Sequence, residues 1–410
     1  MRKKLIKNTV YLYIFTITKI LIPLITLPYF TRVLSIEKYG MVAYIKAYVS
    51  YIQLFLDFGF IFSATKEIVK NKENKEIIGL IVGNTFLEKI ILGIISCILT
   101  IYFTNKIDIM NSNKQFVYLY VFSCILTIFI PDFFFRGIEK MEFVAIPFAC
   151  SKIITLLLTF IVVKNDSQYM YIPKLEILGN SISIFISSFF FAKINVKINH
   201  SNVKSLISDL KESSIYFFSN FATTIFGVMT TLLVGIYMNN IDVAHWSICI
   251  QIISAIKALY APIVNSIYPY MIVSKDIEMI KKISSKFLIP IVCGVLIVFW
   301  GGEKLLMIIG GVNYAYSGYI LKFLAPVFGF SFYSMMMGWP VLGAIGKEKE
   351  TTMSTIVAAS IQVSGIIILI ITSRLELIAL AICCDIAEGA LLLIRGYIYN
   401  RYKKQIANDK

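Results

Sequence analysis

Long apolar segments recur along the whole chain and are separated by short polar loops. A helix needs about 20 apolar residues to cross the roughly 30 Å hydrocarbon core of a bilayer. Twelve segments have this length or come close to it, at residues 9–31, 42–64, 77–103, 116–136, 143–163, 171–192, 214–238, 244–273, 286–301, 319–346, 354–372 and 376–395. Strands of a β-barrel would alternate apolar and polar residues, which residues 90–101 do not. The pattern predicts an all-α polytopic membrane protein with twelve transmembrane helices.

Composition supports this interpretation. Of the 410 residues, 58% are hydrophobic and 15% are charged, and the mean hydropathy is +0.78. A globular soluble domain carries about 25% charged residues. The chain is therefore too apolar for a soluble protein of this length.

The net charge of +15 could indicate a nucleic-acid partner, but its distribution argues against one. Of the 39 Lys and Arg residues, 25 lie at the two ends and on one alternating set of loops, 7 lie on the other set, and 7 lie inside spans. Such an excess marks the cytoplasmic side of a membrane protein. We expect both termini in the cytoplasm, which requires an even number of spans, and no nucleic-acid partner.

The arrangement of spans indicates two similar halves. The longest loop, residues 193–213, separates six spans from six, so we expect one six-helix bundle at 1–200 and another at 201–410. Residues 136–140, RGIEK, and 343–347, GAIGK, are basic turns after the fourth and tenth spans, and they lie 207 residues apart. Six spans per half give a parallel repeat with a pseudo-two-fold axis along the membrane normal. We expect a central hydrated lumen between the bundles.

Seven lysines interrupt the apolar segments: Lys19, Lys46, Lys89, Lys152, Lys174, Lys257 and Lys322. An ammonium near the bilayer centre costs about 2.5–3.5 kcal/mol, so such groups face a bundle interior or a wet cavity. Lys46, Lys174 and Lys322 lie near the outer ends of their spans and could instead reach the interface. Lys19, Lys152 and Lys257 are central and lack a local acid, which favours a role in the lumen. Lys89 follows Glu88, and because such neighbours point apart, each is expected to bond to another helix.

Other polar residues extend these positions into stripes. Lys46, Ser50, Gln53 and Asp57 follow steps of 4, 3 and 4 residues, so they share one helix face. The remaining residues that we expect to line the lumen are Thr16, Asn220, Thr223 and Asn265.

The buried acids allow two interpretations. Asp57, Asp385 and Glu388 could bind H⁺ or Na⁺ as coupling sites, and they could equally neutralise nearby lysines. Residues 385 and 388 are one turn apart on one face.

The chain has no features of an enzyme or of a cofactor site. No loop is long enough for a catalytic or nucleotide-binding domain, and no G-x-x-x-x-G-K-[ST] sequence occurs. The seven cysteines show no metal-ligand spacing, so no metal is expected. Both histidines, His200 and His245, are expected at the surface. Active transport would therefore draw on an ion gradient or the substrate gradient.

The first two spans carry residues that resemble a known family. Asn8 and Tyr11 are followed by PYFTRVL at 28–34, YG at 39–40, FG at 58–59 and ATK at 64–66. This grouping is similar to the amino-terminal region of Wzx-type flippases for lipid-linked oligosaccharides, in the multidrug/oligosaccharidyl-lipid/polysaccharide exporter superfamily. The resemblance in architecture covers the whole chain.

The resemblance implies transport of an undecaprenyl-diphosphate-linked oligosaccharide, such as an O-antigen or capsule repeat unit. The cargo would move by alternating access from the cytoplasmic to the outer leaflet of the bacterial inner membrane. Lysines suit a pyrophosphate as point-charge binders. We expect Lys19, Lys152 and Lys257 to contact it, with Lys46 and Lys322 forming a second station. Further partners would be H⁺ or Na⁺, and a polysaccharide polymerase and chain-length regulator.

Two other functions remain open. A multidrug antiporter of the same superfamily would bind organic cations through lumenal carboxylates, whereas this lumen is expected to be cationic. A membrane-embedded polysaccharide polymerase or ligase would carry a large outer loop with catalytic groups, and the outer loops here are short.

Overall fold

The computed structural model describes residues 2–199, 203–274 and 276–408. Within these ranges it does not describe the side chains of residues 2–6, 203, 219, 222–223, 225–226, 265, 269, 273, 277 and 403–408. The described residues form helices and turns and contain no β-strand, which confirms the all-α prediction. The chain divides into two compact units, Met1–Phe221 (unit 1) and Ala222–Lys410 (unit 2).

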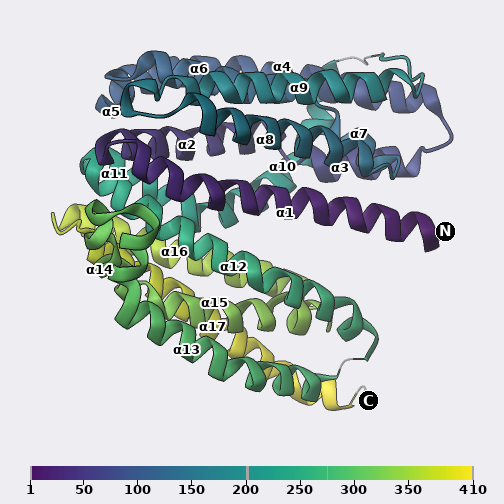
Figure 1. The fold of residues 1–410 in the computed structure, drawn as a ribbon. Helices are drawn as coiled ribbons and strands as arrows, with labels where there is room; N and C mark the ends of the chain where they lie inside the picture. The colour runs from purple at the N-terminus through teal and green to yellow at the C-terminus, as the bar shows by residue number, and fades with distance from the viewer. Residues whose placement is uncertain (1, 200–202, 275, 409–410) are drawn as a thin grey trace. The chain divides into compact units, whose positions relative to one another are not determined.

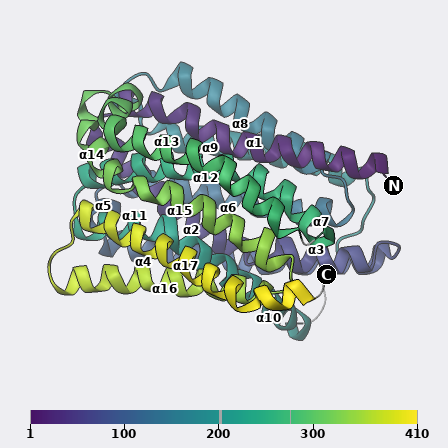
Figure 2. The same cartoon turned by 90° about the horizontal axis from the view of Figure 1, so that it is seen from below.

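Unit 1 is a bundle of long helices joined by short connections (Figure 1). Helix α8 packs between α1 and α9, α9 packs against α6, and α2 packs against α4 and α6. Figure 2 shows the long helices α1 and α8 running nearly parallel. The elements are α1 (Arg2–Val33), α2 (Ile36–Asp57), α3 (Phe60–Lys70), α4 (Lys75–Lys106), α5 (Asp108–Asn111), α6 (Lys114–Leu126), η1 (Thr127–Phe129), α7 (Asp132–Gly137), α8 (Glu142–Val162), η2 (Asp166–Gln168), α9 (Tyr171–Ala192) and most of α10 (Val203–Thr224).

Unit 2 is a second helical bundle. Its helix α17 packs against α15 and α16, and α13 packs against α14 and α15. The elements are η3 (Ile225–Met229), α11 (Thr230–Tyr237), α12 (Asn240–Ser274), α13 (Ile277–Gly310), η4 (Val312–Tyr314), α14 (Ala315–Phe323), α15 (Ala325–Met336), η5 (Met337–Gly343), α16 (Glu348–Ile371) and α17 (Leu377–Asn408).

The helices account for the expected spans. Ten described helices are long and apolar enough to cross a membrane, and a pair bent by 48°, Val312–Phe323 and Ala325–Gly343, makes up to eleven. The shorter apolar helix Gly227–Tyr237 lies in the seventh expected span. The chain is thus a multi-pass helical membrane protein.

Polar side chains begin several of these helices. Ser35 caps α2 by accepting a hydrogen bond from the amide of Lys38, and Asn74 caps α4 by accepting from Glu76 and Ile77. Such caps satisfy amide groups that lack a partner inside the first turn. They therefore fix where spans 2 and 3 start.

The two expected basic turns have the same backbone geometry. The amide of Lys140 donates to the carbonyl of Phe135 at 2.9 Å, and that of Lys347 donates to Leu342, also at 2.9 Å. The residue before each lysine has a positive φ, 59° in one turn and 76° in the other. Both turns therefore close their helices with a bond of the Schellman type. The structure supports the internal repeat at this point.

The spans that precede these turns are both broken. Span 4 is interrupted at Ile130 and Pro131, between η1 and α7. Span 10 is interrupted at Gly338, which has a non-helical ψ of −112° inside η5 and is followed by Pro340. Positions 131 and 338 are again 207 residues apart. The repeat therefore extends from the turn back into the span.

The connection between the units packs on α4. Gly79 and Gly83 lie one turn apart on α4. A Cβ on Gly79 would lie 2.0 Å from the carbonyl oxygen of Lys197, and a Cβ on Gly83 would lie 1.8 Å from that of Asn199. The amide of Asn199 donates to the carbonyl of Gly79 at 3.2 Å. Most of α10 also belongs to unit 1, so the division falls at 221/222 and not at the expected 200/201.

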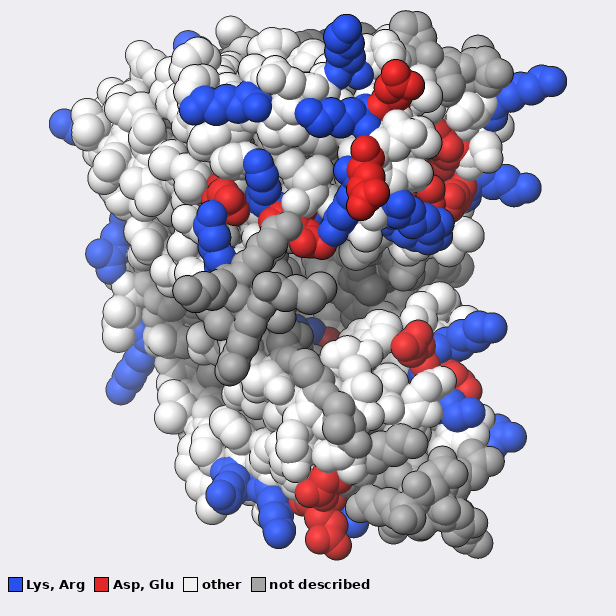
Figure 3. All heavy atoms as spheres, turned by 90° about the vertical axis from the view of Figure 1, so that its right-hand side faces the viewer, with Lys and Arg blue, Asp and Glu red and all other residues white. Residues whose placement is uncertain are grey.

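Charged side chains gather at one end of the unit 1 helices. Figure 3 views this end and shows Lys and Arg interspersed with Asp and Glu. Exposed pairs hold neighbouring segments together here, such as Lys66 with Glu212 at 2.9 Å and Lys7 with Glu142 at 2.9 Å. The end matches the loops that the charge count assigns to the cytoplasm.

The prediction that His245 lies at the surface is wrong. Its side chain is 6% exposed, and its Nδ1 lies 2.6 Å from the hydroxyl of Ser317. Proximity to the end of a span did not imply exposure, because α14 packs against α12 at this level. His200 lies outside the described residues.

Candidate functional site

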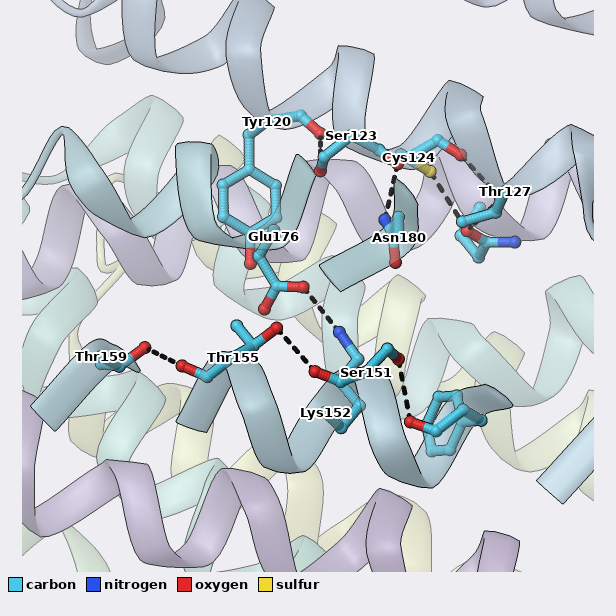
Figure 4. A network of polar contacts seen from close by, with 12 residues as sticks. Tyr120, Ser123, Cys124, Thr127, Ser151, Lys152, Thr155, Thr159, Glu176 and Asn180 are labelled. Carbon is cyan, nitrogen blue, oxygen red and sulfur yellow. Dashed lines mark hydrogen bonds and ion pairs between the residues drawn. The ribbon is translucent and has the colours of Figure 1, made fainter. Parts of the chain in front are cut away.

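A cluster of charges lies between three helices of unit 1. Lys152 on α8 donates a hydrogen bond from Nζ to Oε2 of Glu176 on α9 at 2.6 Å. Figure 4 shows the two side chains pointing toward one another. Lys46 on α2 lies close enough for the charges of both to act on it, and its ammonium lies 4.9 Å from the ring centroid of Phe30. One of the two ammonium groups, that of Lys152, is therefore paired with Glu176, and the other lies within reach of its charge.

Small residues bring the two helices of this pair together. Gly179 on α9 faces Thr155 on α8 so closely that a Cβ would lie 2.3 Å from the threonine hydroxyl. Thr155 donates to the carbonyl of Ser151 on its own helix at 2.8 Å, as the stick view shows. Close approach through small residues is typical of helix packing in membranes. Lys152 and Glu176 lie one turn before Thr155 and Gly179 on their own helices, and the close approach of α8 and α9 lets their side chains reach one another.

Gln53 joins this region to the next acid along α2. Its Oε1 accepts hydrogen bonds from Cys124 and Thr127 on the neighbouring segment, both at 3.2 Å. Its Nε2 donates to Oδ1 of Asp57 at 3.1 Å. Nearby, the side-chain amide of Asn180 donates from Nδ2 to the backbone carbonyl of Ser123 at 2.7 Å (Figure 4). Polar groups therefore continue along the predicted α2 stripe in place of a purely apolar core.

Asp57 is the centre of a second charged cluster. Its Oδ1 lies 3.9 Å from Nζ of Lys89 on α4, and the charges of Lys19 and Asp132 also act on it. The Lys89 side chain is 3% exposed and lies over the ring of Phe133 at 5.5 Å. The prediction that Lys89 bonds to another helix is confirmed. Lys19 is exposed and has no ion pair within the described part of the chain.

Unit 2 contains a separate pair. Lys257 on α12 donates to Oε1 of Glu388 on α17, and Glu388 is 6% exposed. Asp385 lies one turn earlier on α17, and its buried Oδ1 accepts no hydrogen bond from the residues that the structure describes. Lys322 on α14 is half-buried, with its ammonium 4.5 Å from the ring centroid of Phe299. It does not join the Lys257–Glu388 pair.

Lys152 and Lys257 have no acid three or four residues away on their own helices, as expected, but each has an acid from another helix. Glu176 and Glu388 pair with them from other helices. Spacing along one helix detects partners three or four residues away, whereas these partners are 24 and 131 residues away.

The other predicted lumen residues show mixed environments. The hydroxyls of Thr16 and Ser50 donate to carbonyls on their own helices, both at 2.9 Å, and both residues are exposed. Asn220 is half-buried near the end of α10. The side chains of Thr223 and Asn265 lie outside the described residues.

Glu176 is the residue that the sequence interpretation missed. A signal for it exists, because Glu176, Asn180, Ser183 and Ser187 follow helical steps of 4, 3 and 4 residues in the sixth span. Lys174 lies two residues before the acid and therefore on roughly the opposite side of the helix. Lys174 is in fact exposed.

Comparison with known proteins identifies the family. Residues 5–275 match the family described as "Polysaccharide biosynthesis protein". This chain belongs to that family. The match covers unit 1 from residue 5 onward and continues into the first helices of unit 2, and it agrees with the resemblance carried by the first two spans.

Two relatives of this chain carry the name "Putative O-antigen transporter". The protein from Shigella dysenteriae is 28% identical over 353 residues, which cover 84% of this chain and 87% of the relative. The protein from Escherichia coli K12 is 24% identical over 409 residues, covering 95% and 96%. Both names describe transport and neither describes an enzymatic reaction.

Solved structures show that the fold is shared more widely. The lipid II flippase MurJ in an inward closed conformation superimposes with a TM-score of 0.75 at 15% identity, covering 96% of this chain and 87% of MurJ. An inward-facing multidrug transporter of the MATE family gives a TM-score of 0.68 at 12% identity, covering 94% and 99%. This chain therefore has the fold that the MATE transporter and MurJ share.

Proposed function

We propose that this protein is a flippase that moves an undecaprenyl-diphosphate-linked oligosaccharide from the cytoplasmic to the outer leaflet of the bacterial inner membrane. It works by alternating access, with both termini in the cytoplasm. The cargo class is supported by the family and by the names of the two relatives. O-antigen and capsule repeat units share this lipid anchor.

The observation that carries the proposal is the group of Lys46, Lys152 and Glu176. Lys152 is paired with Glu176 and the charges of both act on Lys46, so this group has two ammonium groups and one carboxylate. An isolated charge there is costly, so a cationic site is stable when an anion occupies it. A pyrophosphate supplies that anion, and a lysine binds phosphate as a compact point charge.

The clusters suggest how the cargo charge is handled. Lys152 and Lys257 each hold a carboxylate that an incoming pyrophosphate would displace. Because Lys46 lies beside Lys152, we group it with that lysine in the proposed site. Lys19 and Lys322 have no ion pair within the described residues, so they can take phosphate oxygens without losing a partner.

The ion pairs between lysines and acids also provide a way to couple cargo transport to H⁺ or Na⁺. A proton on Glu388 would release the ammonium of Lys257, and one on Asp57 would release Lys89. Cation binding at an acid and anion binding at its lysine are then linked events. Asp385, with its unpartnered Oδ1, is the third candidate acid.

The test is reconstitution of the purified protein in liposomes that contain a labelled lipid-linked oligosaccharide. A membrane-impermeant enzyme that cleaves the glycan reports the fraction in the outer leaflet. We expect transfer above that of protein-free liposomes, and transfer that responds to an imposed H⁺ or Na⁺ gradient. Transfer equal to that of empty liposomes would reject the proposal.

A second arm separates the nearest alternative. A multidrug antiporter of the same fold would carry organic cations, and the observation that favours it is the buried Oδ1 of Asp385, which accepts no hydrogen bond from the described residues. The same liposomes are therefore assayed for uptake of a fluorescent organic cation. Uptake without glycolipid transfer would replace the flippase proposal with that alternative.

A further inference from the structure

Glu88 is a deeply buried acid with one oxygen that has no hydrogen-bond partner among the described residues. It lies in the middle of α4, its side chain is 1% exposed, and its Oε1 accepts no hydrogen bond from any described residue. Its neighbour Lys89 points elsewhere, toward Asp57 and the ring of Phe133. An ionised carboxylate in this position would be unpaired and strongly disfavoured. Glu88 therefore requires a bound positive charge.

A second carboxylate lies near Glu88, on the helix that leaves unit 1. This is Asp209 on α10, which lies close enough for its charge to act on Glu88. Asn84, one turn before Glu88 on the same face of α4, donates from Nδ2 to Oδ2 of Asp209 at 3.1 Å. The two acids thus lie on the two sides of one helix contact. Like charges at such a contact repel, so they are stable together when one positive charge is shared.

The charged groups around this pair do not supply that charge. Glu67 and Glu212 also act on Asp209 and add to the negative potential. Lys66 is paired with Glu212 at 2.9 Å at the exposed edge of the contact. Within the described part of the chain, neither Glu88 nor Asp209 forms an ion pair with a lysine or arginine.

The same face of α10 is packed closely on unit 1. The hydroxyls of Ser63 on α3 and Ser213 on α10 lie 2.7 Å apart. A Cβ on Gly59 would lie 2.6 Å from the carbonyl oxygen of Ser213, and the rings of Phe58 and Phe217 stack with centroids 4.7 Å apart. The repelling carboxylates therefore sit in a contact that is otherwise held at van der Waals distance.

We infer that Glu88 and Asp209 bind one monovalent cation between them, a proton or Na⁺, and that this cation holds α10 against unit 1. Carboxylate oxygens suit both, since two carboxylates can share one proton and hard oxygen ligands bind alkali cations. Because α10 continues through η3 into unit 2, occupancy of the site would control the connector between the two units. The inference does not depend on what the protein transports.

The test uses the thermal unfolding of the purified full-length protein and two variants, Glu88→Gln and Asp209→Asn. Each amide keeps the shape of the acid and removes its charge. The matched control is Glu73→Gln, an exposed acid in the turn just before α4. The melting temperature, Tm, is measured as Na⁺ replaces choline at constant ionic strength, and separately as pH is varied without Na⁺.

If Na⁺ is the ligand, Na⁺ raises the Tm of the parent and of Glu73→Gln, and this rise is lost in both site variants. If a proton is the ligand, Na⁺ has no effect, and the Tm of the parent falls as pH rises because the folded state holds a proton that the unfolded state releases. That fall is lost in Glu88→Gln, which mimics the protonated acid.

Two results would overturn the inference. One is a parent Tm that responds neither to Na⁺ nor to pH, which needs no variant and so holds even if a variant fails to fold. The other is a response of the same size in the parent and in Glu88→Gln. Binding of radioactive Na⁺ to the parent and the two variants gives an independent measure of the Na⁺ arm.

Discussion

Lys152 and Glu176 form a 2.6 Å ion pair across α8 and α9 with about a quarter of each side chain exposed, 24% and 22%. This intermediate exposure sets its strength. Fully exposed pairs contribute about 0–1 kcal/mol, whereas breaking a fully buried pair costs about 3–5 kcal/mol. A pair of intermediate exposure is stable in the absence of cargo, and Lys152 can still exchange Glu176 for a phosphate.

Reversing the charges tests whether this pair stabilises unit 1. Lys152→Glu would place two carboxylates together and lower the free energy of unfolding by an amount between about 1 and about 3–5 kcal/mol. Adding Glu176→Lys should recover most of that loss in the double variant, as read from Tm. Lys174→Glu, a change at an exposed position on the same helix as Glu176, is the control and should leave Tm nearly unchanged. A double variant as unstable as Lys152→Glu alone would contradict the ion pair.

Replacing Lys257 tests its role in transport. Lys257→Ala should abolish export in the liposome assay and leave membrane insertion normal. However, it also leaves Glu388, 6% exposed, without its cation, which lowers stability on its own. The double variant Lys257→Ala/Glu388→Gln removes both charges and should recover Tm without recovering export. Full export in that double variant would exclude Lys257 from the mechanism.

The sequence predicted those features that depend on one helix at a time. The apolar segments gave the spans, and steps of 3 and 4 residues placed Lys46, Gln53 and Asp57 on one face of α2, where the structure has two of them in a polar network. The matching basic turns at 140 and 347 also have the same capping bonds. These features follow from helical periodicity and backbone geometry, which are local.

Contacts between helices could not be predicted in the same way. Glu176 meets Lys152 because α8 packs on α9, and Glu388 meets Lys257 because α12 lies near α17. The sequence of one helix does not contain the information about which helix packs against it. Arg395 illustrates the same limit. The charge count placed it with the cytoplasmic loops, yet its side chain is 7% exposed because three helices of unit 2 surround it.

Adding one methyl group to α4 tests how closely the connection between the units packs on this helix. In Gly83→Ala the new Cβ would lie 1.8 Å from the carbonyl oxygen of Asn199, a backbone atom that moves only if the connection moves. We expect a loss of about 1–3 kcal/mol, typical of overpacking, measured by thermal unfolding. Gly294→Ala on α13 is the control, since nothing lies within 4 Å of its Cβ. It should be neutral or stabilising by about 0.5–1 kcal/mol.

Arg395 on α17 holds the broken span of unit 2 in place. Its Nη1 donates to the carbonyl of Ser334 at 2.6 Å, near the C-terminus of α15. Its Nε and Nη2 donate to the hydroxyls of Ser354 and Thr355 on α16, at 3.1 and 3.0 Å. The guanidinium is therefore fixed at the end of a helix where the macrodipole favours a cation. The break at Gly338 lies directly against it.

Gly338→Ala would place a Cβ 2.9 Å from Nη1 of Arg395 and 3.2 Å from its Cζ. An arginine tip usually moves aside, but this one is held by three hydrogen bonds, so moving it should cost about 1.5–3 kcal/mol for each charged bond lost. In an Arg395→Met background the guanidinium is absent, and the same glycine substitution should cost much less. Unfolding of the four proteins gives a double-mutant cycle, with Gly389→Ala, whose Cβ has ordinary contacts at 3.6 Å, as the control. An equal cost of Gly338→Ala in both backgrounds would show that the backbone break, and not Arg395, requires glycine here.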